Sequence, residues 1–266
     1  FLKPRVGEDK LMRDPCIIKG PDGKFHMVWT VSWGEKGIGY AHSEDLVNWS
    51  EQQYIPVMEH EPKAKNCWAP ELFYDAENKE YLIFWATTIP GKFPETDNQS
   101  SQGPPHPGYN HRIYYTTTRD FKEFSPTEIF YNKGFNVIDA TIEKSDSQYI
   151  MFLKDESNKP FETQKNIRIA TSGNAAGPYS DASEPITGDY WAEGPTATQI
   201  NGRWVVYFDK YIEHNMGAVM STDLKNWKEI SDSLDFPDRT RHGTVFKVSQ
   251  DVLDHIKSVK SGSKKE

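Results

Sequence analysis

A short segment recurs along this chain, and the repeat limits the folds that the chain can adopt. Ser43-Glu-Asp-Leu-Val-Asn-Trp49 returns as Ser221-Thr-Asp-Leu-Lys-Asn-Trp227, and looser copies begin at Thr118 and Thr171. A short run of strand-forming residues precedes each copy, and a longer run rich in aromatic and β-branched residues precedes that one. The chain is therefore predicted to repeat one β unit.

Each unit reads as strand, polar turn, strand, connection, strand and a fourth strand that carries the repeated tryptophan. The predicted second strands span 25–31, 81–87, 149–153 and 204–208, and the third strands span 38–42, 112–117, 167–171 and 217–220. The innermost strands are predicted to open at Asp14, Ala69, Asp139 and Glu193. Four strands in this order form one blade of a β-propeller, and four complete blades can be read.

The C-terminal part supplies only a portion of a fifth blade. Residues 241–248 read as an innermost strand, whereas 249–260 place Val252, Leu253, Ile256 and Val259 at helical spacing. The prediction is an all-β, five-bladed β-propeller with an incomplete fifth blade and a short C-terminal helix. We expect a propeller domain at 1–248, a helix with a polar tail at 249–266, and the missing strands upstream of Phe1.

Composition excludes two classes of function. The 31 basic and 39 acidic residues give a formal net charge of −8, which excludes a nucleic-acid binder held by bulk charge. The apolar runs are far shorter than the roughly 20 residues that span a bilayer. We therefore expect a monomer with no membrane insertion. Cys16 and Cys67 are too few for a disulfide scaffold, and their pairing state stays open.

Three carboxylates fall at the predicted starts of innermost strands. Counting back from the aromatic residue that opens each second strand places Asp14, Ala69, Asp139 and Glu193 at equivalent positions. Innermost strands line the axial channel, so these residues should form a ring at one mouth of it. Carboxylates around one centre suit glycoside hydrolysis, which needs a proton donor and a base or nucleophile. A divalent-metal site is the competing interpretation of the ring.

Four short motifs at blade spacing resemble those of glycoside hydrolase family 43, which comprises five-bladed inverting arabinofuranosidases, xylosidases and arabinanases. They are Arg13-Asp14-Pro15, Trp68-Ala69-Pro70-Glu71, Ile138-Asp139-Ala140 and Glu193-Gly194-Pro195. The resemblance covers nearly the whole chain. It implies that Asp14 is the general base, Glu193 the general acid, and Asp139 the acid that tunes and orients Glu193. Alanine follows Asp139 where the family more often has proline.

Other residues are candidates for substrate or metal binding. Trp68 and Trp191 lie close to the acids in sequence and could stack on a sugar, and Arg241 could bond hydroxyls. Blade packing and surface solvation are the alternatives for these three. The resemblance implies that no cofactor is required, and that His242 helps to hold a structural calcium near the axis unless it is a core histidine. The proline-rich stretch 89–111 should wall one side of the channel mouth.

These residues favour an inverting, exo-acting glycoside hydrolase that removes a terminal pentose, α-L-arabinofuranose or β-xylose, from a plant-type polysaccharide or oligosaccharide. Asp14 would deprotonate water while Glu193 protonates the leaving oxygen. A non-catalytic carbohydrate-binding propeller is the alternative. A sialidase is a third option because residues 43–49 faintly resemble the Asp boxes of that family, although the glycine expected there is missing. A periplasmic or secreted location is inferred from the substrate class.

Overall fold

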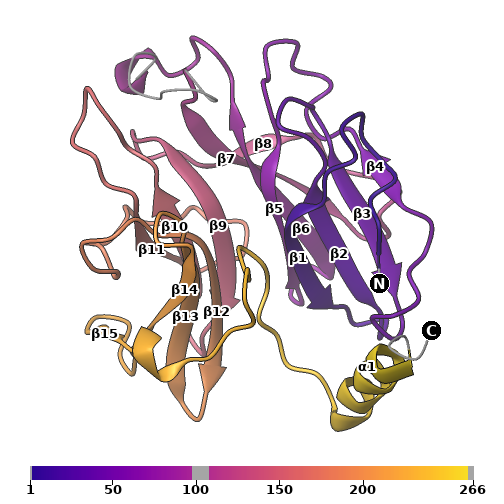
Figure 1. The fold of residues 1–266 in the computed structure, drawn as a ribbon. Helices are drawn as coiled ribbons and strands as arrows, with labels where there is room; N and C mark the ends of the chain where they lie inside the picture. The colour runs from indigo at the N-terminus through magenta and orange to yellow at the C-terminus, as the bar shows by residue number, and fades with distance from the viewer. Residues whose placement is uncertain (1, 98–107, 263–266) are drawn as a thin grey trace.

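The computed structural model describes residues 2–97 and 108–262, and it shows four antiparallel sheets arranged around a common axis (Figure 1). The first sheet contains β1 (Arg13–Lys19), β2 (Phe25–Thr30), β3 (Ile38–Ser43) and β4 (Gln53–Ile55). The second contains β5 (Trp68–Asp75), β6 (Glu80–Thr88), β7 (His111–Thr118) and β8 (Glu128–Tyr131). The third contains β9 (Val137–Lys144), β10 (Tyr149–Asp155) and β11 (Asn166–Ser172). The fourth contains β12 (Glu193–Ile200), β13 (Arg203–Lys210), β14 (Asn215–Ser221) and β15 (Lys228–Glu229).

The predicted propeller is confirmed as four blades followed by a C-terminal helix. In each sheet the strands pair in chain order, and the innermost strands β1, β5, β9 and β12 are neighbours around the axis. The second strands β2 and β10 are buried along their whole length. Neighbouring blades cover both faces of β10, whereas one face of β2 packs against the N-terminal residues Leu2, Val6 and Met12. Separate apolar clusters fill the spaces between successive blades.

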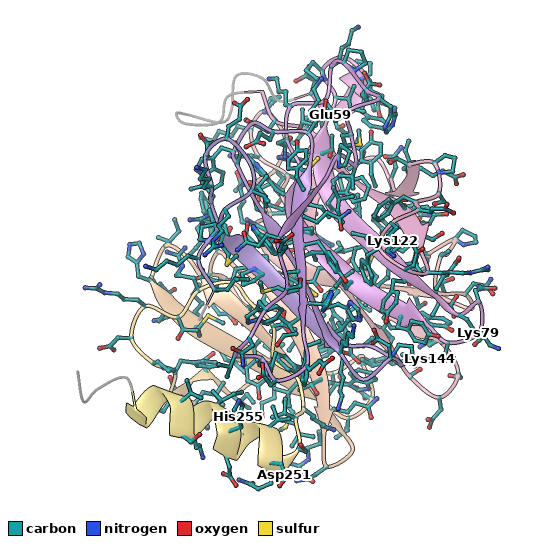
Figure 2. All side chains as sticks on the ribbon, turned by 90° about the vertical axis from the view of Figure 1, so that its right-hand side faces the viewer. Glu59, Lys79, Lys122, Lys144, Asp251 and His255 are labelled. Carbon is teal, nitrogen blue, oxygen red and sulfur yellow. The ribbon has the colours of Figure 1, made fainter. Side chains whose placement is uncertain are left out.

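The helix α1 (Gln250–Gly262) lies where apolar residues at helical spacing predicted one. It stands apart from the four sheets at one end of the molecule, with Asp251 and His255 on its surface (Figure 2). His255 reaches back to the first blade, where its Nε2 lies 3.5 Å from Oδ2 of Asp45. In residues 2–97 and 108–262 no helix is both long enough and apolar enough to cross a bilayer.

The structure corrects the placement of the repeated segment. Residues 43–49 form a turn rather than a fourth strand, and Trp49 contributes only an isolated bridge to Ser43. Asp45 causes the turn, because its Oδ1 accepts hydrogen bonds from the backbone amides of Val47 and Asn48 at 2.9 and 2.7 Å. A side chain that satisfies two backbone donors replaces the strand ladder at this point.

Two further predicted strands are absent from the described residues. The third blade has three strands, and the chain after β11 follows it with backbone hydrogen bonds from Ser180, Ser183 and Ile186 but without a regular ladder. Residues 241–248 are extended and are not a strand. Instead of a ladder, the Ile17 amide donates to Oγ1 of Thr244 and the Val245 amide donates to Oγ1 of Thr196. The side chains of Thr244 and Thr196 thus join residues 241–248 to β1 and β12.

Every innermost strand is bulged near its first residue, and the bulges correct the predicted register. Asp14, Ala69, Asp139 and Gly194 have φ angles of 50°, 45°, 50° and 59°. Gly194, not Glu193, is therefore the equivalent of Asp14 and Asp139. Counting across the first hairpin turn misplaced Glu193 by one residue because the turns differ in length. Bulges re-aim side chains at strand ends, and here they do so at the channel mouth.

Candidate active site

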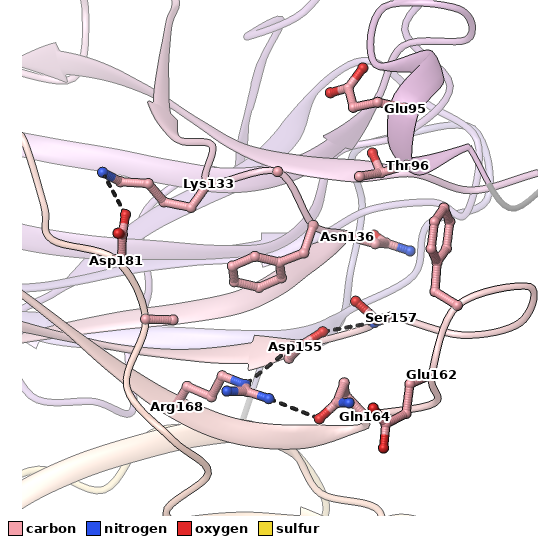
Figure 3. Close-up of a pocket in the computed structure, with 14 residues that line it drawn as sticks. Glu95, Thr96, Lys133, Asn136, Asp155, Ser157, Glu162, Gln164, Arg168 and Asp181 are labelled. Carbon is pink, nitrogen blue, oxygen red and sulfur yellow. Dashed lines mark hydrogen bonds and ion pairs between the residues drawn. The ribbon is translucent and has the colours of Figure 1, made fainter.

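Two cavities lie close to the starts of the innermost strands. The axial cavity, about 220 Å³, is lined by all three predicted acids, Asp14, Asp139 and Glu193. Trp68 and His242 line it too, so five of the seven predicted site residues come together. Its other lining residues are Arg13, Trp33, His111, Ile138, Lys154, Glu156 and Tyr211. The rim cavity, about 490 Å³, lies between the second and third blades and contains none of the predicted residues (Figure 3).

Asp14 is oriented by a chain of two hydrogen bonds that joins the first two blades. The Thr30 hydroxyl donates to Oδ2 of Asp14 at 3.1 Å, and it accepts from the backbone amide of Ala69 at 2.9 Å. On the other oxygen, Oδ1 lies 3.5 Å from Nδ1 of His242. The carboxylate is therefore fixed from two sides while it still borders the cavity.

Asp139 positions the backbone beside Glu193. Its Oδ2 accepts a hydrogen bond from the Gly194 amide at 3.0 Å. Burial raises the pKa of Asp139 to about 6, although His242 and Lys154 act in the opposite direction. The contact fixes the peptide bond between Glu193 and Gly194. Because the pKa of Asp139 is raised to about 6, its protonation state changes close to neutral pH.

Gly194 lets the imidazole of His242 approach the backbone. A Cβ at this position would lie 2.4 Å from Cγ of His242, and the φ of +59° already disfavours other residues. Burial alone would lower the pKa of His242, but the carboxylates of Asp139, Asp14 and Glu71 together raise it. The imidazole therefore places positive charge among the acids over a wider pH range.

Glu193 is held by two cations. Its Oε2 accepts a hydrogen bond from Nζ of Lys154 at 3.0 Å, and its Oε1 lies 3.9 Å from Nη2 of Arg241. Arg241 itself is bound through Nε to the fully buried Asp209, the residue that pairs with Glu193 across β12 and β13. Arg241 does not line the axial cavity, so the structure places it behind Glu193.

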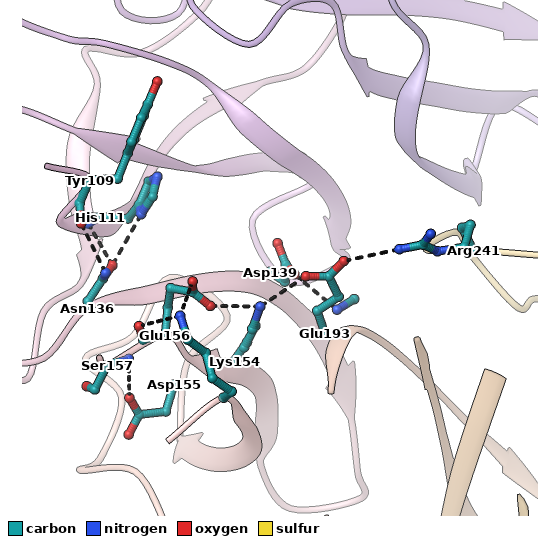
Figure 4. A network of polar contacts seen from close by, with 12 residues as sticks. Tyr109, His111, Asn136, Asp139, Lys154, Asp155, Glu156, Ser157, Glu193 and Arg241 are labelled. Carbon is teal, nitrogen blue, oxygen red and sulfur yellow. Dashed lines mark hydrogen bonds and ion pairs between the residues drawn. The ribbon is translucent and has the colours of Figure 1, made fainter. Parts of the chain in front are cut away.

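Lys154 belongs to a buried ionic network that sequence analysis missed (Figure 4). Its Nζ lies 2.7 Å from Oε2 of Glu156, whose other oxygen is bound by Lys165. Burial alone would lower the pKa of Lys154, but the carboxylates of Glu156 and Glu193 raise it well above its usual value. Lys154 therefore stays charged and acts as a fixed donor to Glu193.

An aromatic wall closes one side of the axial cavity. Trp68 stacks on Tyr109 at a centroid distance of 4.7 Å and meets Trp33 edge-on at 5.5 Å. Trp191 is not part of this wall. It is 41% exposed and lies 5.8 Å from the ring of Tyr211, which does line the cavity. Trp68 can thus border a bound ring, while Trp191 stands farther out.

The stretch 89–111 contributes to the site only through its end, as far as it is described. Tyr109 packs on Trp68, and His111 lines the cavity. Burial lowers the pKa of His111 to about 3, so the ring is neutral. Its Nδ1 faces Oδ1 of Asn136 at 3.2 Å, and among the described residues its buried Nε2 has no hydrogen-bond partner. Pro104, Pro105, His106 and Pro107 lie outside the described residues.

The described residues around His242 do not form a set of ligands for the predicted calcium. Within residues 2–97 and 108–262, no group of three His, Cys, Asp or Glu side chains is placed to hold a metal ion. The nearest carboxylate oxygen to Nδ1 of His242 belongs to Asp14, which is also held by Thr30. The calcium stays a prediction, and no step of the chemistry below depends on it. Cys16 and Cys67 are free, buried thiols.

A second sequence signal could have found three residues of the site. Thr30, Ala86, Lys154 and Asp209 each stand five residues after the aromatic that opens a second strand, and each pairs with the residue just before a bulge. Three of the four are polar in otherwise apolar runs. They are the residues that contact Asp14, Glu193 and Arg241.

Comparison with known proteins identifies the family of this chain. Residues 1–254 match a family model related to glycoside hydrolase family 43, described as "Probable glycosyl hydrolase domain". A curated α-L-arabinofuranosidase of Bifidobacterium longum subsp. longum is 24% identical over 230 residues, which cover 71% of this chain and 21% of that protein. The chain thus spans about a fifth of the length of that relative.

Solved structures share the fold at low sequence identity. A thermostable family-43 glycoside hydrolase superposes with a TM-score of 0.62 and 15% identity, covering 83% of this chain and 72% of that one. An α-L-arabinofuranosidase from Lactobacillus brevis gives 0.60 and 18%, with 83% and 72% covered. An exo-β-1,3-galactanase from Phanerochaete chrysosporium gives 0.61 and 14%, with 83% and 50% covered.

Proposed function

Since the chain belongs to the glycosyl hydrolase domains related to glycoside hydrolase family 43, we propose that it is an inverting, exo-acting glycosidase that removes a terminal pentose from an oligosaccharide or polysaccharide. The observation that carries the proposal is the convergence of Asp14, Asp139 and Glu193 on one small cavity. α-L-Arabinofuranose is the proposed sugar, and β-xylose is the second choice.

In the proposed reaction each acid handles a different proton. Asp14 takes a proton from a water molecule, whose oxygen bonds to the anomeric carbon from the face opposite the leaving group. Glu193 gives its proton to the glycosidic oxygen as the bond from that oxygen to the anomeric carbon breaks. Asp139 does not contact the scissile bond in this scheme. It holds the Gly194 amide and thereby positions Glu193.

The size of the axial cavity supports action at a chain end. Its volume of about 220 Å³ equals that of about seven water molecules at ~30 Å³ each, which is the scale of a single sugar ring. The aromatic ring of Trp68 lines the cavity, and contact with an aromatic ring suits the apolar side of a sugar. One terminal residue is therefore the natural occupant.

The choice of arabinofuranose rests on the relatives. The curated relative and one of the similar structures carry the name α-L-arabinofuranosidase, while two other similar structures are named as a β-1,3-galactosidase and an exo-β-1,3-galactanase. Galactosides therefore belong in any substrate screen. The periplasmic or secreted location is likewise a proposal drawn from the substrate class.

One observation favours a second candidate, a non-catalytic carbohydrate-binding propeller. Lys154 donates a hydrogen bond to Oε2 of Glu193, and Arg241 lies 3.9 Å from Oε1, so the carboxyl group is fixed in place by two cations. A binding site could use the same carboxylate to accept sugar hydroxyls. Measured hydrolysis distinguishes the two candidates.

The test is a panel of aryl arabinofuranoside, xyloside and galactoside substrates, assayed with the wild type and with Asp14→Asn. We expect turnover of the arabinofuranoside by the wild type and its loss in the variant. The first product, followed by proton NMR, should have the inverted anomeric configuration. Retained configuration would exclude the inverting mechanism, and binding of oligosaccharide without any turnover would favour the second candidate.

A further inference from the structure

The rim cavity has the features of a second sugar-binding site. It measures about 490 Å³, more than twice the axial cavity, and falls within the range of roughly 300–1,000 Å³ that ligand sites usually occupy. Phe135 and Phe161 line it, and Phe161 leaves 42% of its surface exposed. An exposed aromatic ring in a polar cavity is a suitable stacking face for a sugar.

The polar side of the cavity is rigid because its charges are already paired. Nε of Arg168 lies 3.1 Å from Oδ2 of Asp155, Nη1 donates to the Ser183 carbonyl, and Nη2 donates to Oε1 of Gln164 at 2.8 Å. Oδ1 of Asp155 accepts the Ser157 amide at 3.0 Å. Figure 3 shows these side chains along one wall.

Hydrogen-bonding capacity remains on that wall. Oε1 of Gln164 accepts hydrogen bonds from both Arg168 and Asn166. The side-chain amide nitrogen of Gln164 makes no hydrogen bond among the described residues. The Ser157 hydroxyl likewise makes none there. Fixed donors beside an aromatic ring are the combination that orients a polyhydroxylated ligand.

The charge of the cavity selects a neutral ligand. Its ionisable lining residues are four acids and two bases, Glu95, Asp155, Glu162 and Asp181 against Lys133 and Arg168. Lys133 lies 3.2 Å from Asp181, and Arg168 is paired with Asp155. The two cations are thus neutralised, and Glu95 lies 3.8 Å from Arg112. Among the described lining residues Glu162 remains as an unpaired negative charge. An anionic ligand such as a uronate or a phosphate would be repelled.

The rim cavity is a direct neighbour of the axial cavity. Successive residues at the end of β10 alternate between them, with Lys154 and Glu156 lining the axial cavity and Asp155 and Ser157 lining the rim cavity. Asn136 lines the rim cavity, and its Oδ1 accepts from the backbone amide of His111, which lines the axial cavity. The two cavities therefore lie on opposite sides of the same strand end.

The geometry points to the rim cavity as a binding subsite for neutral sugar units beyond the scissile bond, with Phe161 as the stacking face and Gln164 as the orienting donor. This role builds on the proposed glycosidase function, since the glycan is the same molecule. The subsite would hold a polymer or a long oligosaccharide while the axial cavity accepts only its end. Aryl monoglycosides would not reach it.

Affinity electrophoresis in native gels containing arabinan, arabinoxylan or arabinogalactan tests the subsite without requiring turnover. The wild type and Glu193→Gln should be retarded by at least one of these polymers, and Phe161→Ala and Gln164→Ala should each weaken the retardation about two- to tenfold. Ile129→Ala is the matched control, because Ile129 is 41% exposed and does not line the cavity. Its retardation should equal that of the wild type.

Kinetics separate the subsite from the catalytic proposal. In Phe161→Ala, KM for the retarding polymer or its oligosaccharides should rise about two- to tenfold, while kcat/KM for an aryl arabinofuranoside should stay unchanged. Retardation that persists in both cavity variants, or absence of retardation by all three polymers, would overturn the subsite. Retardation that is lost in these variants of a protein without hydrolytic activity would support the subsite and refute the glycosidase.

Discussion

At the scale of single residues, Gly194 carries the tightest steric constraint in the candidate site. Its φ of +59° and the 2.4 Å approach of His242 act on the same position. Gly202 offers a matched comparison, because its φ is +74° but nothing lies within 4 Å of the Cβ that an alanine would add. The pair separates backbone strain from steric overlap.

We expect Gly202→Ala to lower the free energy of unfolding by about 1 kcal/mol and to leave activity unchanged. Gly194→Ala should cost about 1–3 kcal/mol more, because His242 or the backbone must move, and it should also reduce kcat. Urea unfolding and assays on an aryl glycoside measure both effects. Equal losses of stability in the two variants would show that the overlap with His242 is relieved without cost.

The proposed roles of Asp14 and Glu193 predict different dependence on the leaving group. Asp14→Asn removes the base, so activity should fall on every substrate. Glu193→Gln removes the proton donor, a contribution of typically ~10²- to 10⁴-fold, and should spare an aryl glycoside whose phenolate leaves readily. Comparison of kcat for a nitrophenyl glycoside and a natural disaccharide tests this. The same dependence in both variants would mean that the roles are wrongly assigned.

Asp139 should make the stability of the fold depend on pH. Because burial raises its pKa to about 6, from an unfolded value near ~3.9, its favourable contribution is complete below ~pH 4 and is lost as pH rises through about 6. Relative to the wild type, Asp139→Asn should therefore gain stability between pH 4 and pH 7, by roughly 1–3 kcal/mol. Urea unfolding of the wild type and of Asp139→Asn at pH 4 and at pH 7 measures this difference in stability. Asp146→Asn, at an exposed turn, should show no such trend.

At the scale of elements, the repeated turn is a unit of stability in its own right. Asp45 accepts hydrogen bonds from the Val47 amide, the Asn48 amide and the Asn48 side chain. Asp223 repeats the arrangement with Lys225 and Asn226. The same residues therefore close the same turn in the first and fourth blades.

Asp45→Ala should lower the free energy of unfolding by about 0.5–2 kcal/mol, the usual cost of losing a side chain that caps backbone donors. Glu44→Ala is the control, since Glu44 is the exposed neighbour in the same turn. Its effect should stay within ~0.5 kcal/mol. Urea unfolding of the two variants measures both effects. An unchanged free energy of unfolding in Asp45→Ala would show that the backbone holds the turn without the carboxylate.

The strands were the easiest elements to predict, and the turn was the hardest. Aromatic and β-branched runs bury both faces of the second strands, so the apolar pattern alone located β2, β6, β10 and β13. Trp49 also reads as a strand residue, but Asp45 takes up the backbone donors that a ladder would need. A local side-chain bond thus overrides strand propensity at this position.

Asp14 and Asp139 were predictable because they stand at the repeated bulge position. Glu193 was found only because it lies one residue before that position, and the contacts of the network behind the acids were not predictable. Lys154 lies near the end of an apolar strand, and a single lysine at such a position is ordinarily exposed to solvent. Only the fold shows that Glu156 and Glu193 converge on it. The recurring position five residues into each second strand could have marked Lys154 as a candidate. Its partners could not be found in that way, because contacts between blades depend on how the sheets pack.

At the scale of the whole molecule, residues 241–248 connect the fourth blade to the first. Oγ1 of Thr244 accepts from the Ile17 amide at 3.1 Å and donates to the Pro15 carbonyl at 3.0 Å. The next residue, Val245, donates its amide to Oγ1 of Thr196 on β12. Thr244 and Val245 thus join β1 to β12. Two residues earlier in the same segment, His242 contacts Asp14.

Thr244→Val keeps the shape of the side chain but removes both hydrogen bonds to the first blade, leaving the Ile17 amide without its acceptor. An unsatisfied donor of this kind costs about 1–3 kcal/mol, so the free energy of unfolding should fall by that amount. Thr240→Val is the matched control, because in the part of the chain that the structure describes the Thr240 hydroxyl bonds only the Pro237 carbonyl within its own turn. This variant should cost less than ~1 kcal/mol. Since the segment also carries His242, Thr244→Val should reduce kcat, whereas Thr240→Val should not. Equal unfolding free energies for the two variants, measured in urea, would show that the blades hold together without this connection.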